Sequence, residues 1–215
     1  MSLWQVHTIL PNNLVPVKNE PGSPLIKSLD LLTQASLGRM KMFYVDTIGF
    51  SLISYSSTRL IMQGGLTRIT FEQIENAQTR PFYHFAFNIP ENKIQSAFEW
   101  QRKLTPIIHP SPTGPLDEIT HFPHWDAHSI FFLDPAGNLV EYIARHALDN
   151  SRKGPFTTQD ILYASEIGFI ANDVKSTGDL LLKHLKLKEY RPLTNNFWPI
   201  GDEHGLLLLI EKGKE

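Results

Sequence analysis

The sequence predicts an α+β protein built from tandem βαβββ modules. Three segments share one order of elements, in which a strand is followed by an amphipathic helix, another strand and a hairpin. Two of these segments are complete and the third is shorter. Each unit has one apolar face and open strand edges, so we expect two units to pair into a partly open barrel. The concave sheets of such a barrel would enclose a cleft, and a cleft is where a ligand binds.

The three segments divide the chain into five parts. These are an N-terminal extension (1–25), a first βαβββ module (26–79), a second βαβββ module (80–147), a connector (148–164) and a third, partial module (165–215). The connector contains LDNSRKGPFTTQD, which is polar and rich in turn-forming residues.

In the first module, SLDLLTQ is expected to be a strand and SLGRMKMFYVDTIGF a helix with its exit. Ser36 is the expected N-cap and Gly49 the expected terminator. Apolar side chains fall on one helical face, at Leu37, Met40, Phe43 and Tyr44. FSLISYS then has strand composition, and RLIMQGGLTRITFEQI predicts a hairpin that turns at Gly64 and Gly65.

The second and third modules follow the same order. YHFAFNIP predicts a strand that ends at Pro90, a helix follows, and LTPIIHPSPTGP predicts a short strand before a Pro-rich loop. HSIFFLDPAGNLVEY then predicts a hairpin with a turn at DPAG. In the third module, SEIGFIANDV and EYRPL are expected strands on either side of a helix, and NFWPIGDEHGLLLLIEK closes the module as a hairpin.

Composition excludes several classes of protein. Twenty Lys and Arg residues nearly balance 22 Asp and Glu residues, and they are scattered, so we expect neither a nucleic-acid partner nor a membrane partner. The absence of cysteine excludes disulfides, cysteine-ligated zinc and thiol nucleophiles. There is no apolar run of about 18 residues and no secretory signal, so we expect a cytoplasmic protein.

The clearest chemical signal is Glu141, which lies inside the apolar strand NLVEYIA. A buried, ionised carboxylate without a partner is costly, so it requires a cation, a set of hydrogen-bond donors or a metal. Arg145 or a lysine is one available partner for an edge position. A nearby histidine together with a metal is the other.

Three segments resemble the vicinal oxygen chelate superfamily: MFYVDTIGF, FYHFAFNIP and SIFFLDPAGNLVEYIAR. This superfamily includes glyoxalase I, extradiol catechol dioxygenases, fosfomycin-resistance proteins and bleomycin-binding proteins. The resemblance covers about residues 26–146, and FLDPAGNLVE approximates the FxDPxGNxxE hairpin that is fairly specific for the superfamily. Because the same fold isomerises, epimerises, cleaves rings, opens epoxides or only sequesters, the resemblance leaves the reaction open.

The resemblance implies a divalent metal ion in the cleft. His84, on the first strand of the second module, and Glu141, on its last strand, match two of the family's ligand positions. Fe(II) is the expected ion, with Mn, Zn or Ni as alternatives. The corresponding positions of the first module fall on poor ligands, namely Ser28 or Leu29 and Arg68 or Thr70.

The third ligand is open at this point. His128 is a candidate because its strand neighbours that of Glu141, but strand alternation favours Ser129 and Phe131 as the residues that face the cleft. Only a bulge would turn His128 inward. His121 matches the position of an acid/base group in related enzymes, so we expect it to be catalytic.

Two carboxylates are weaker candidates. Asp30 lies in the strand SLDLLTQ, and Glu166 opens the third module at a position loosely equivalent to that of His84. At such positions, surface or strand-end carboxylates are commoner than ligands. His124 is expected in a loop, and His7 precedes the repeats.

These observations favour a metal-dependent enzyme that chelates two neighbouring oxygens of a small, possibly aromatic, substrate. A dioxygenase-like reaction is slightly preferred over a glyoxalase-like one, because the first module lacks the glyoxalase carboxylate. The alternative is a metal-free binding protein of the bleomycin-resistance type. The open edges of the partial module also predict a homodimer, or a missing ligand supplied by another strand or chain.

Overall fold

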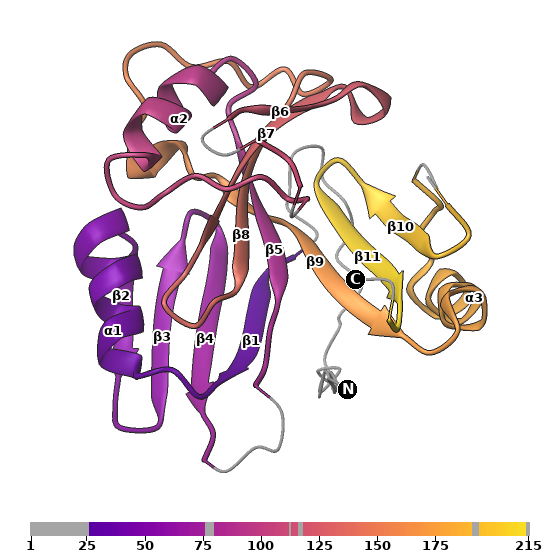
Figure 1. Ribbon diagram of the computed structural model, residues 1–215, viewed down its shortest axis with the longest axis horizontal. Coiled ribbons are helices and arrows are strands. Elements are labelled where there is room, and N and C mark those ends of the chain that lie inside the picture. The colour runs from indigo at the N-terminus through magenta and orange to yellow at the C-terminus, as the bar shows by residue number, and fades with distance from the viewer. Residues whose placement is uncertain (1–25, 76–79, 112, 116–117, 191–193, 214–215) are drawn as a thin grey trace.

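The computed structural model of the chain describes residues 26–75, 80–111, 113–115, 118–190 and 194–213 (Figure 1). Within these residues the fold is α+β, as predicted. Its two sheets have four and seven strands, and each sheet contains both parallel and antiparallel strand pairs. In the same part of the chain, no helix combines the length and the apolar composition needed to cross a membrane.

The first module forms the four-stranded sheet, with strand order β1-β4-β3-β2. Its strands are β1 (Ser28–Thr33), β2 (Ser51–Tyr55), β3 (Arg59–Gly64) and β4 (Thr67–Gln73). Helix α1 (Leu37–Lys41) continues into a π-helical segment η1 (Met42–Ile48). Gly49 ends this helix in the left-handed region with φ of 95°, which is the predicted terminator. Ser36 occupies the N-cap, but its side chain makes no capping hydrogen bond there.

The second and third modules share the seven-stranded sheet, with strand order β10-β11-β9-β5-β8-β7-β6. Its strands are β5 (His84–Ile89), β6 (Thr120–Phe122), β7 (Ala127–Leu133), β8 (Leu139–Arg145), β9 (Tyr163–Ala171), β10 (Phe197–Asp202) and β11 (Gly205–Glu211). The α-helices are α2 (Ile94–Gln101) and α3 (Val174–Leu185), and short 3₁₀ turns cover Pro123–Trp125 and Thr158–Asp160. The two modules join where β5 pairs antiparallel with β9.

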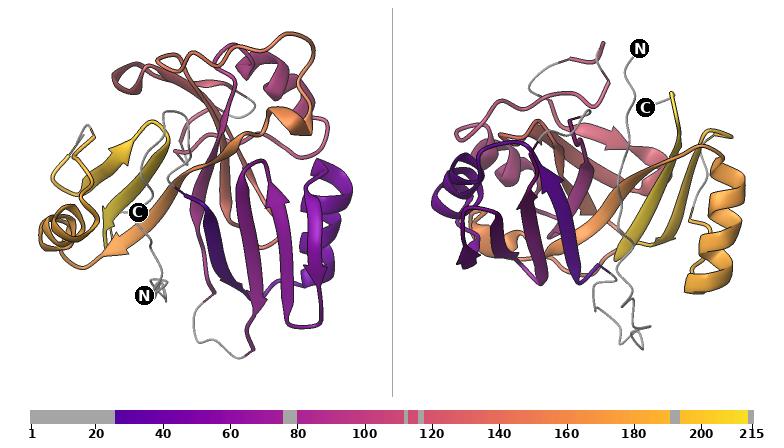
Figure 2. Two further views of the ribbon diagram at one scale, coloured as in Figure 1. Left: turned by 180° about the vertical axis from the view of Figure 1, so that it is seen from behind. Right: turned by 90° about the horizontal axis from the view of Figure 1, so that it is seen from below.

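The largest core packs one face of the second module against the first module. It includes residues of both sheets, such as Leu60, Phe71, Phe87, Phe132 and Tyr142. Figure 2 shows the four-stranded sheet beside the second module, with the third module on the far side. A smaller apolar cluster lies on the other face of the seven-stranded sheet, at Ala86, Trp125, Ala127, Ile143, Leu206 and Leu208. This second face carries the candidate site described below.

Some predicted elements differ in the structure. The predicted strand in LTPIIHPSPTGP is reduced to one bridge between Ile108 and Phe131, and a short strand, β6, forms later at Thr120–Phe122. The predicted strand EYRPL is reduced to a bridge between Glu189 and Ile200, while 191–193 lie outside the described residues. In the first of these segments, proline and polar side chains suit a loop better than a paired strand.

The β3–β4 turn touches the connector through Gly65. Gly65 has φ of +56°, and a Cβ atom added there would lie 2.1 Å from the carbonyl oxygen of Leu162. The next residue, Leu66, donates its N–H to the same carbonyl at 2.8 Å. The turn therefore needs glycine for both its dihedral angle and this close approach.

We expect Gly65→Ala to lower the free energy of unfolding by about 2 to 4 kcal/mol, because left-handed strain adds to a backbone clash. Gly154→Ala is the matched control, since Gly154 also has positive φ but no neighbour within 4 Å. The control is expected to lose only about 1 kcal/mol. Urea unfolding of both variants measures the difference, and equal losses would contradict the proposed contact.

Candidate metal centre

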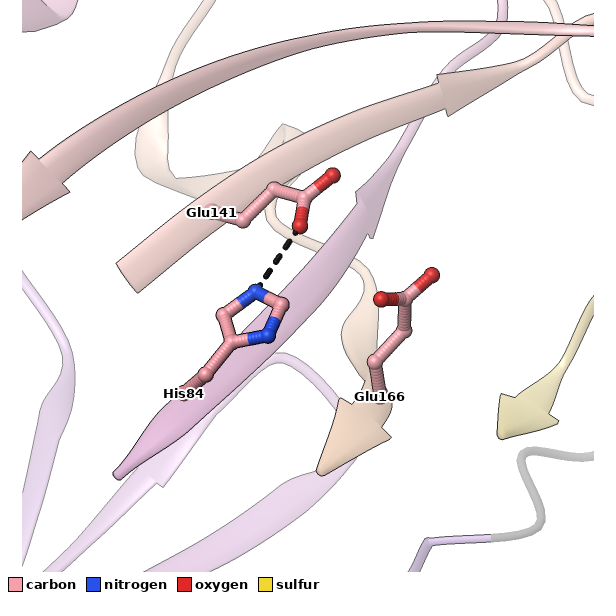
Figure 3. A group of neighbouring side chains, drawn as sticks. All are labelled: His84, Glu141 and Glu166. Atoms are coloured by element: carbon pink, nitrogen blue, oxygen red, sulfur yellow. Dashed lines mark hydrogen bonds and ion pairs between the residues drawn. The ribbon is translucent and has the colours of Figure 1, made fainter. Parts of the chain in front are cut away.

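Three side chains from three adjacent strands meet on the second face of the seven-stranded sheet. They are His84 of β5, Glu141 of β8 and Glu166 of β9 (Figure 3). One ligand atom from each lies within 4.8 Å of the other two. An imidazole nitrogen and carboxylate oxygens are ordinary ligands of divalent metal ions.

The strand register explains this meeting. In the parallel β5–β8 pair Ala86 lies opposite Glu141, and in the antiparallel β5–β9 pair Ala86 lies opposite Glu166. His84 is two residues before Ala86, so its side chain points to the same face. The methyl group of Ala86 leaves space between the two carboxylates, which larger side chains would fill.

A bulge in β9 sets the direction of Glu166. The register with β5 shifts after Ala86, so that Glu166 pairs with Ala86 but Ala164 pairs with Phe87. Ser165 is the extra residue between them. As a result Glu166 faces the site, whereas Ala164, two residues earlier, and Ile167, the next residue, both face the main core.

His84 and Glu141 form a direct pair. His84 Nε2 lies 3.0 Å from Glu141 Oε2, and the Glu141 residue is 3% exposed. Burial by itself lowers the pKa of His84. The hydrogen bond and charge of Glu141, together with the charge of Glu166, outweigh burial and leave the pKa of His84 raised.

Glu166 is paired with the buried guanidinium of Arg145. The two side chains form an ion pair, and both residues are almost fully buried, with 2% of Glu166 and 1% of Arg145 exposed. Burial and the neighbouring Glu141 charge raise the pKa of Glu166 from 4.5 to about 7, against the opposing effects of Arg145 and His84. Arg145 Nε also donates to Asn88 Oδ1 at 3.2 Å, and its guanidinium lies 5.6 Å from the ring centroid of Trp125.

The charges of this group suit a divalent cation. Two buried carboxylates lie next to one imidazole, and a single guanidinium neutralises only part of their charge. A metal ion would replace the proton shared by His84 and Glu141 and would compete with protons for Glu166. The three side chains therefore fit a divalent ion, and no other charged residue is needed to bind it.

Polar and aromatic side chains extend the same face toward β6. Phe131 lies opposite Glu141, and its ring centroid is 6.3 Å from that of His84 and 6.2 Å from that of Phe122. Thr120 pairs with Ser129 across β6 and β7. The buried hydroxyl oxygens of both residues have no hydrogen-bond partner among the described residues. Such orphaned groups are normally satisfied by a ligand or by water.

The structure corrects two of the predicted site residues. His128 pairs with Ala144, which belongs to the main core, so His128 points to the face opposite Glu141. His121 pairs with His128 and stacks on it, so it shares this opposite face. Ser129 and Phe131 face the site instead, as strand alternation predicted, because β7 has no bulge in its pairing with β8.

The third module supplies the residue that the first module lacks. Ser28, Leu29, Arg68 and Thr70 lie in the separate four-stranded sheet, where Ser28 pairs with Arg68. Asp30 is exposed on β1 and His124 is exposed in a 3₁₀ turn, while His7 lies outside the described residues. Glu166, expected to be a surface or strand-end carboxylate, is instead buried beside His84. The sequence contained one signal for Glu166: it lies on the first strand of the third module, as His84 lies on the first strand of the second.

Comparisons with known proteins support the fold. No protein-family model matches the sequence, and no curated protein matches it. Among solved structures, a candidate dioxygenase from Bacillus subtilis subsp. subtilis str. 168 superposes with a TM-score of 0.59 at 15% identity, over 86% of this chain and 63% of that chain. A variant of glyoxalase I from Zea mays superposes with a TM-score of 0.53 at 16% identity, over 87% of this chain and 68% of that chain.

The chain therefore has the fold of the vicinal oxygen chelate superfamily. The resemblance found in the sequence is confirmed at the level of the fold. The chain spans 63% of the length of the Bacillus protein, so the comparison concerns part of that molecule.

We expect Arg145→Met to lower the free energy of unfolding by about 3 to 5 kcal/mol, because it leaves Glu166 buried without its cation. The double variant Arg145→Met/Glu166→Gln should lose less than the sum of its two single variants, since both charges are then absent. Chemical unfolding of the four proteins measures this coupling. Additive losses would show that the ion pair does not stabilise the fold.

Proposed function

We propose that the protein is a metal-dependent enzyme that chelates two neighbouring oxygens of a small, planar substrate. The observation that carries this proposal is the group formed by the partly buried His84 and the buried Glu141 and Glu166, whose ligand atoms lie within 4.8 Å of one another. Fe(II) is the proposed ion, because one imidazole and two carboxylates suit an ion that accepts both nitrogen and oxygen ligands. Mn(II) has the same preference for this donor set, and Zn or Ni are further alternatives.

When bound, the ion would supply Lewis acidity to the substrate oxygens. The protein's own side chains bind and orient the substrate. Phe131 and Phe122 form an aromatic wall beside His84 that suits a planar ring. The hydroxyls of Ser129 and Thr120 are available for its polar groups. Arg145 keeps a positive charge next to Glu166, where it favours an anionic oxygen.

A dioxygenase-like reaction remains our preference within this class. In the third module, the position equivalent to Glu141 is Leu208, which pairs with Gly168 two residues after Glu166. The fourth ligand position therefore carries an apolar, 3% exposed side chain. With His84, Glu141 and Glu166 as its only protein ligands, a bound ion would keep positions available for a substrate and a second reactant. His121 has no part in this mechanism, because it lies on the opposite face.

One observation favours a second candidate function, which is metal-free binding. His84 already shares a hydrogen bond with Glu141, and Glu166 already pairs with Arg145. Both carboxylates thus have partners without an ion. A binding protein could use the aromatic wall and the free hydroxyls to hold an aromatic ligand.

We expect protein purified without chelators or a histidine tag to bind one Fe(II) or Mn(II) ion at this centre, and Glu141→Ala or Glu166→Gln to lose it. Each change removes one of three ligands, so the affinity should fall at least tenfold. Glu72→Gln is the control, because Glu72 pairs on the surface with Arg59. Anaerobic titration followed by metal analysis measures the binding. If none of the proteins binds an ion at this centre, the metal-free binding function is favoured.

The reaction is tested on the Fe(II)-loaded protein. Oxygen consumption with a panel of catechols is expected, and it should disappear in Glu141→Ala but persist in Glu72→Gln. Turnover of thiol adducts of dicarbonyl compounds without oxygen uptake would instead identify a glyoxalase-like enzyme.

We further propose a cytoplasmic homodimer that forms along strand β2. This strand is at the edge of its sheet, and its five residues are all exposed. Three of them are large and apolar: Leu52 is 43% exposed, Ile53 53% and Tyr55 49%. An exposed apolar strand edge pairs readily with another strand, and a second copy of this chain provides an identical edge.

We expect Ile53→Lys to shift the protein from dimer to monomer, because a charge on this edge opposes pairing of two copies. Leu180→Lys is the matched control, since Leu180 is 56% exposed on α3. Light scattering during size-exclusion chromatography measures the mass of each. A monomeric parent protein, or an equal shift in the control, would contradict dimerisation through β2.

A further inference from the structure

A second group of histidines lies on the opposite face of the second module from the candidate metal centre. It lines a surface groove of about 560 Å³, together with the first residues of helix α2. The residues that matter are His121 of β6, His128 of β7, His146 directly after β8, and Glu91 before α2. None of them belongs to the group around His84.

Two imidazole nitrogens in this groove point at one another. His128 Nδ1 lies 2.8 Å from His146 Nε2, so one nitrogen carries a proton and the other offers a lone pair. The ring of His121 is nearly parallel to that of His128, with 4.3 Å between the centroids and 10° between the planes. Two imidazoles therefore face each other, and the third is stacked on one of them rather than directed at the same point.

Glu91 orients the His146 ring from the side opposite His128. Glu91 Oε2 lies 3.5 Å from His146 Nδ1, and Glu91 Oε1 accepts a hydrogen bond from the Ser151 hydroxyl. A carboxylate behind Nδ1 favours the proton on that nitrogen, which leaves the lone pair of Nε2 directed at His128. Metal-binding histidines have this arrangement, with a carboxylate on the nitrogen that does not bind the ion.

We propose that this groove is a second metal site, which binds Zn²⁺ or a similar ion through His128 Nδ1 and His146 Nε2. The His121 imidazole would become the third ligand by turning out of its stack on His128, because two parallel rings cannot direct their in-plane lone pairs at one ion. The ion would replace the proton now shared by His128 and His146. Two Zn–N bonds of about 2.0 to 2.1 Å at a tetrahedral angle separate their nitrogens by roughly 3.3 Å. The two nitrogens therefore need to move apart by only about 0.5 Å. The exposed side chain of His146 has room for this movement, and the exposed His121 has room to turn toward the ion.

The chemistry of the groove differs from that of the first centre. Here the ligands are imidazoles alone, at a partly exposed position, which favours Zn²⁺ or Cu²⁺ over ions that prefer oxygen. At the first centre two buried carboxylates join a single, partly buried imidazole. Since the two sites are on opposite faces of one sheet, each is expected to fill without the other.

The test is a titration of the full chain with Zn²⁺ against a chromophoric chelator, with no histidine tag present. The variants are His128→Ala and His146→Gln, and the second guards against misfolding because His146 is exposed. Each is expected to weaken zinc binding in the groove at least tenfold. Glu91→Gln should weaken it less, since Glu91 only orients His146. His184→Ala, an exposed histidine of α3, is the control and should have no effect.

Glu141→Ala separates this site from the first one. Groove binding should be unchanged in Glu141→Ala and at least tenfold weaker in His128→Ala, whether or not the first centre holds an ion. With Cu²⁺ as the probe, nitrogen hyperfine lines from several imidazoles are expected in the electron paramagnetic resonance spectrum of Glu141→Ala. Zinc affinity that is unchanged in both His128→Ala and His146→Gln, or equally reduced in His184→Ala, would overturn the proposal.

Discussion

The antiparallel pairing of β5 with β9 is the interaction on which the rest of the structure depends. It joins the second and third modules into one sheet and places Glu166 opposite Ala86, next to His84 and Glu141. Without this pairing the second module would present one histidine and one carboxylate, and Arg145 would have lost its partner. The third module is thus part of the candidate site as well as part of the fold.

The group formed by this pairing is costly to bury. His84, Glu141, Glu166 and Arg145 are ionisable groups in contact, and three of them are at most 3% exposed. Apolar side chains of similar volume would often be at least as stable in such a position. The chain nevertheless has charges here, next to buried hydroxyls of Ser129 and Thr120 that lack partners in the described structure. Departures of this kind from optimal packing are concentrated at functional sites.

Strand alternation separates the two histidine-containing sites. Along β7, Ser129 and Phe131 face the carboxylates, and His128 faces the groove. A shift of one residue in this register would exchange the two sets of side chains completely. The uninterrupted pairing of β7 with β8 excludes that exchange, and it therefore decides that His121 and His128 lie together and apart from Glu141.

Much of this arrangement follows from the sequence. Period-2 alternation, turn residues and glycine positions predicted most of the strands, the hairpin that carries Glu141 and the inward direction of Ser129 and Phe131. The resemblance of FYHFAFNIP and FLDPAGNLVE to segments of a known family identified His84 and Glu141, and the structure brings them to 3.0 Å. The strands, turns and side-chain directions are local features, so neighbouring residues along the chain are enough to specify them.

Only the tertiary structure decided that Glu166 is the third member of the group with His84 and Glu141. Which module lies beside the second one depends on packing between residues about 80 positions apart, and no local pattern reports it. The bulge at Ser165 also sets the face of Glu166, and the extra residue is visible only when β5 and β9 are paired. For the same reason the convergence of His146 with His128 and Glu91 could not be predicted, because three separate segments meet only in the folded sheet. The sequence by itself therefore determined the modules and one half of the candidate centre, and long-range strand pairing completed it.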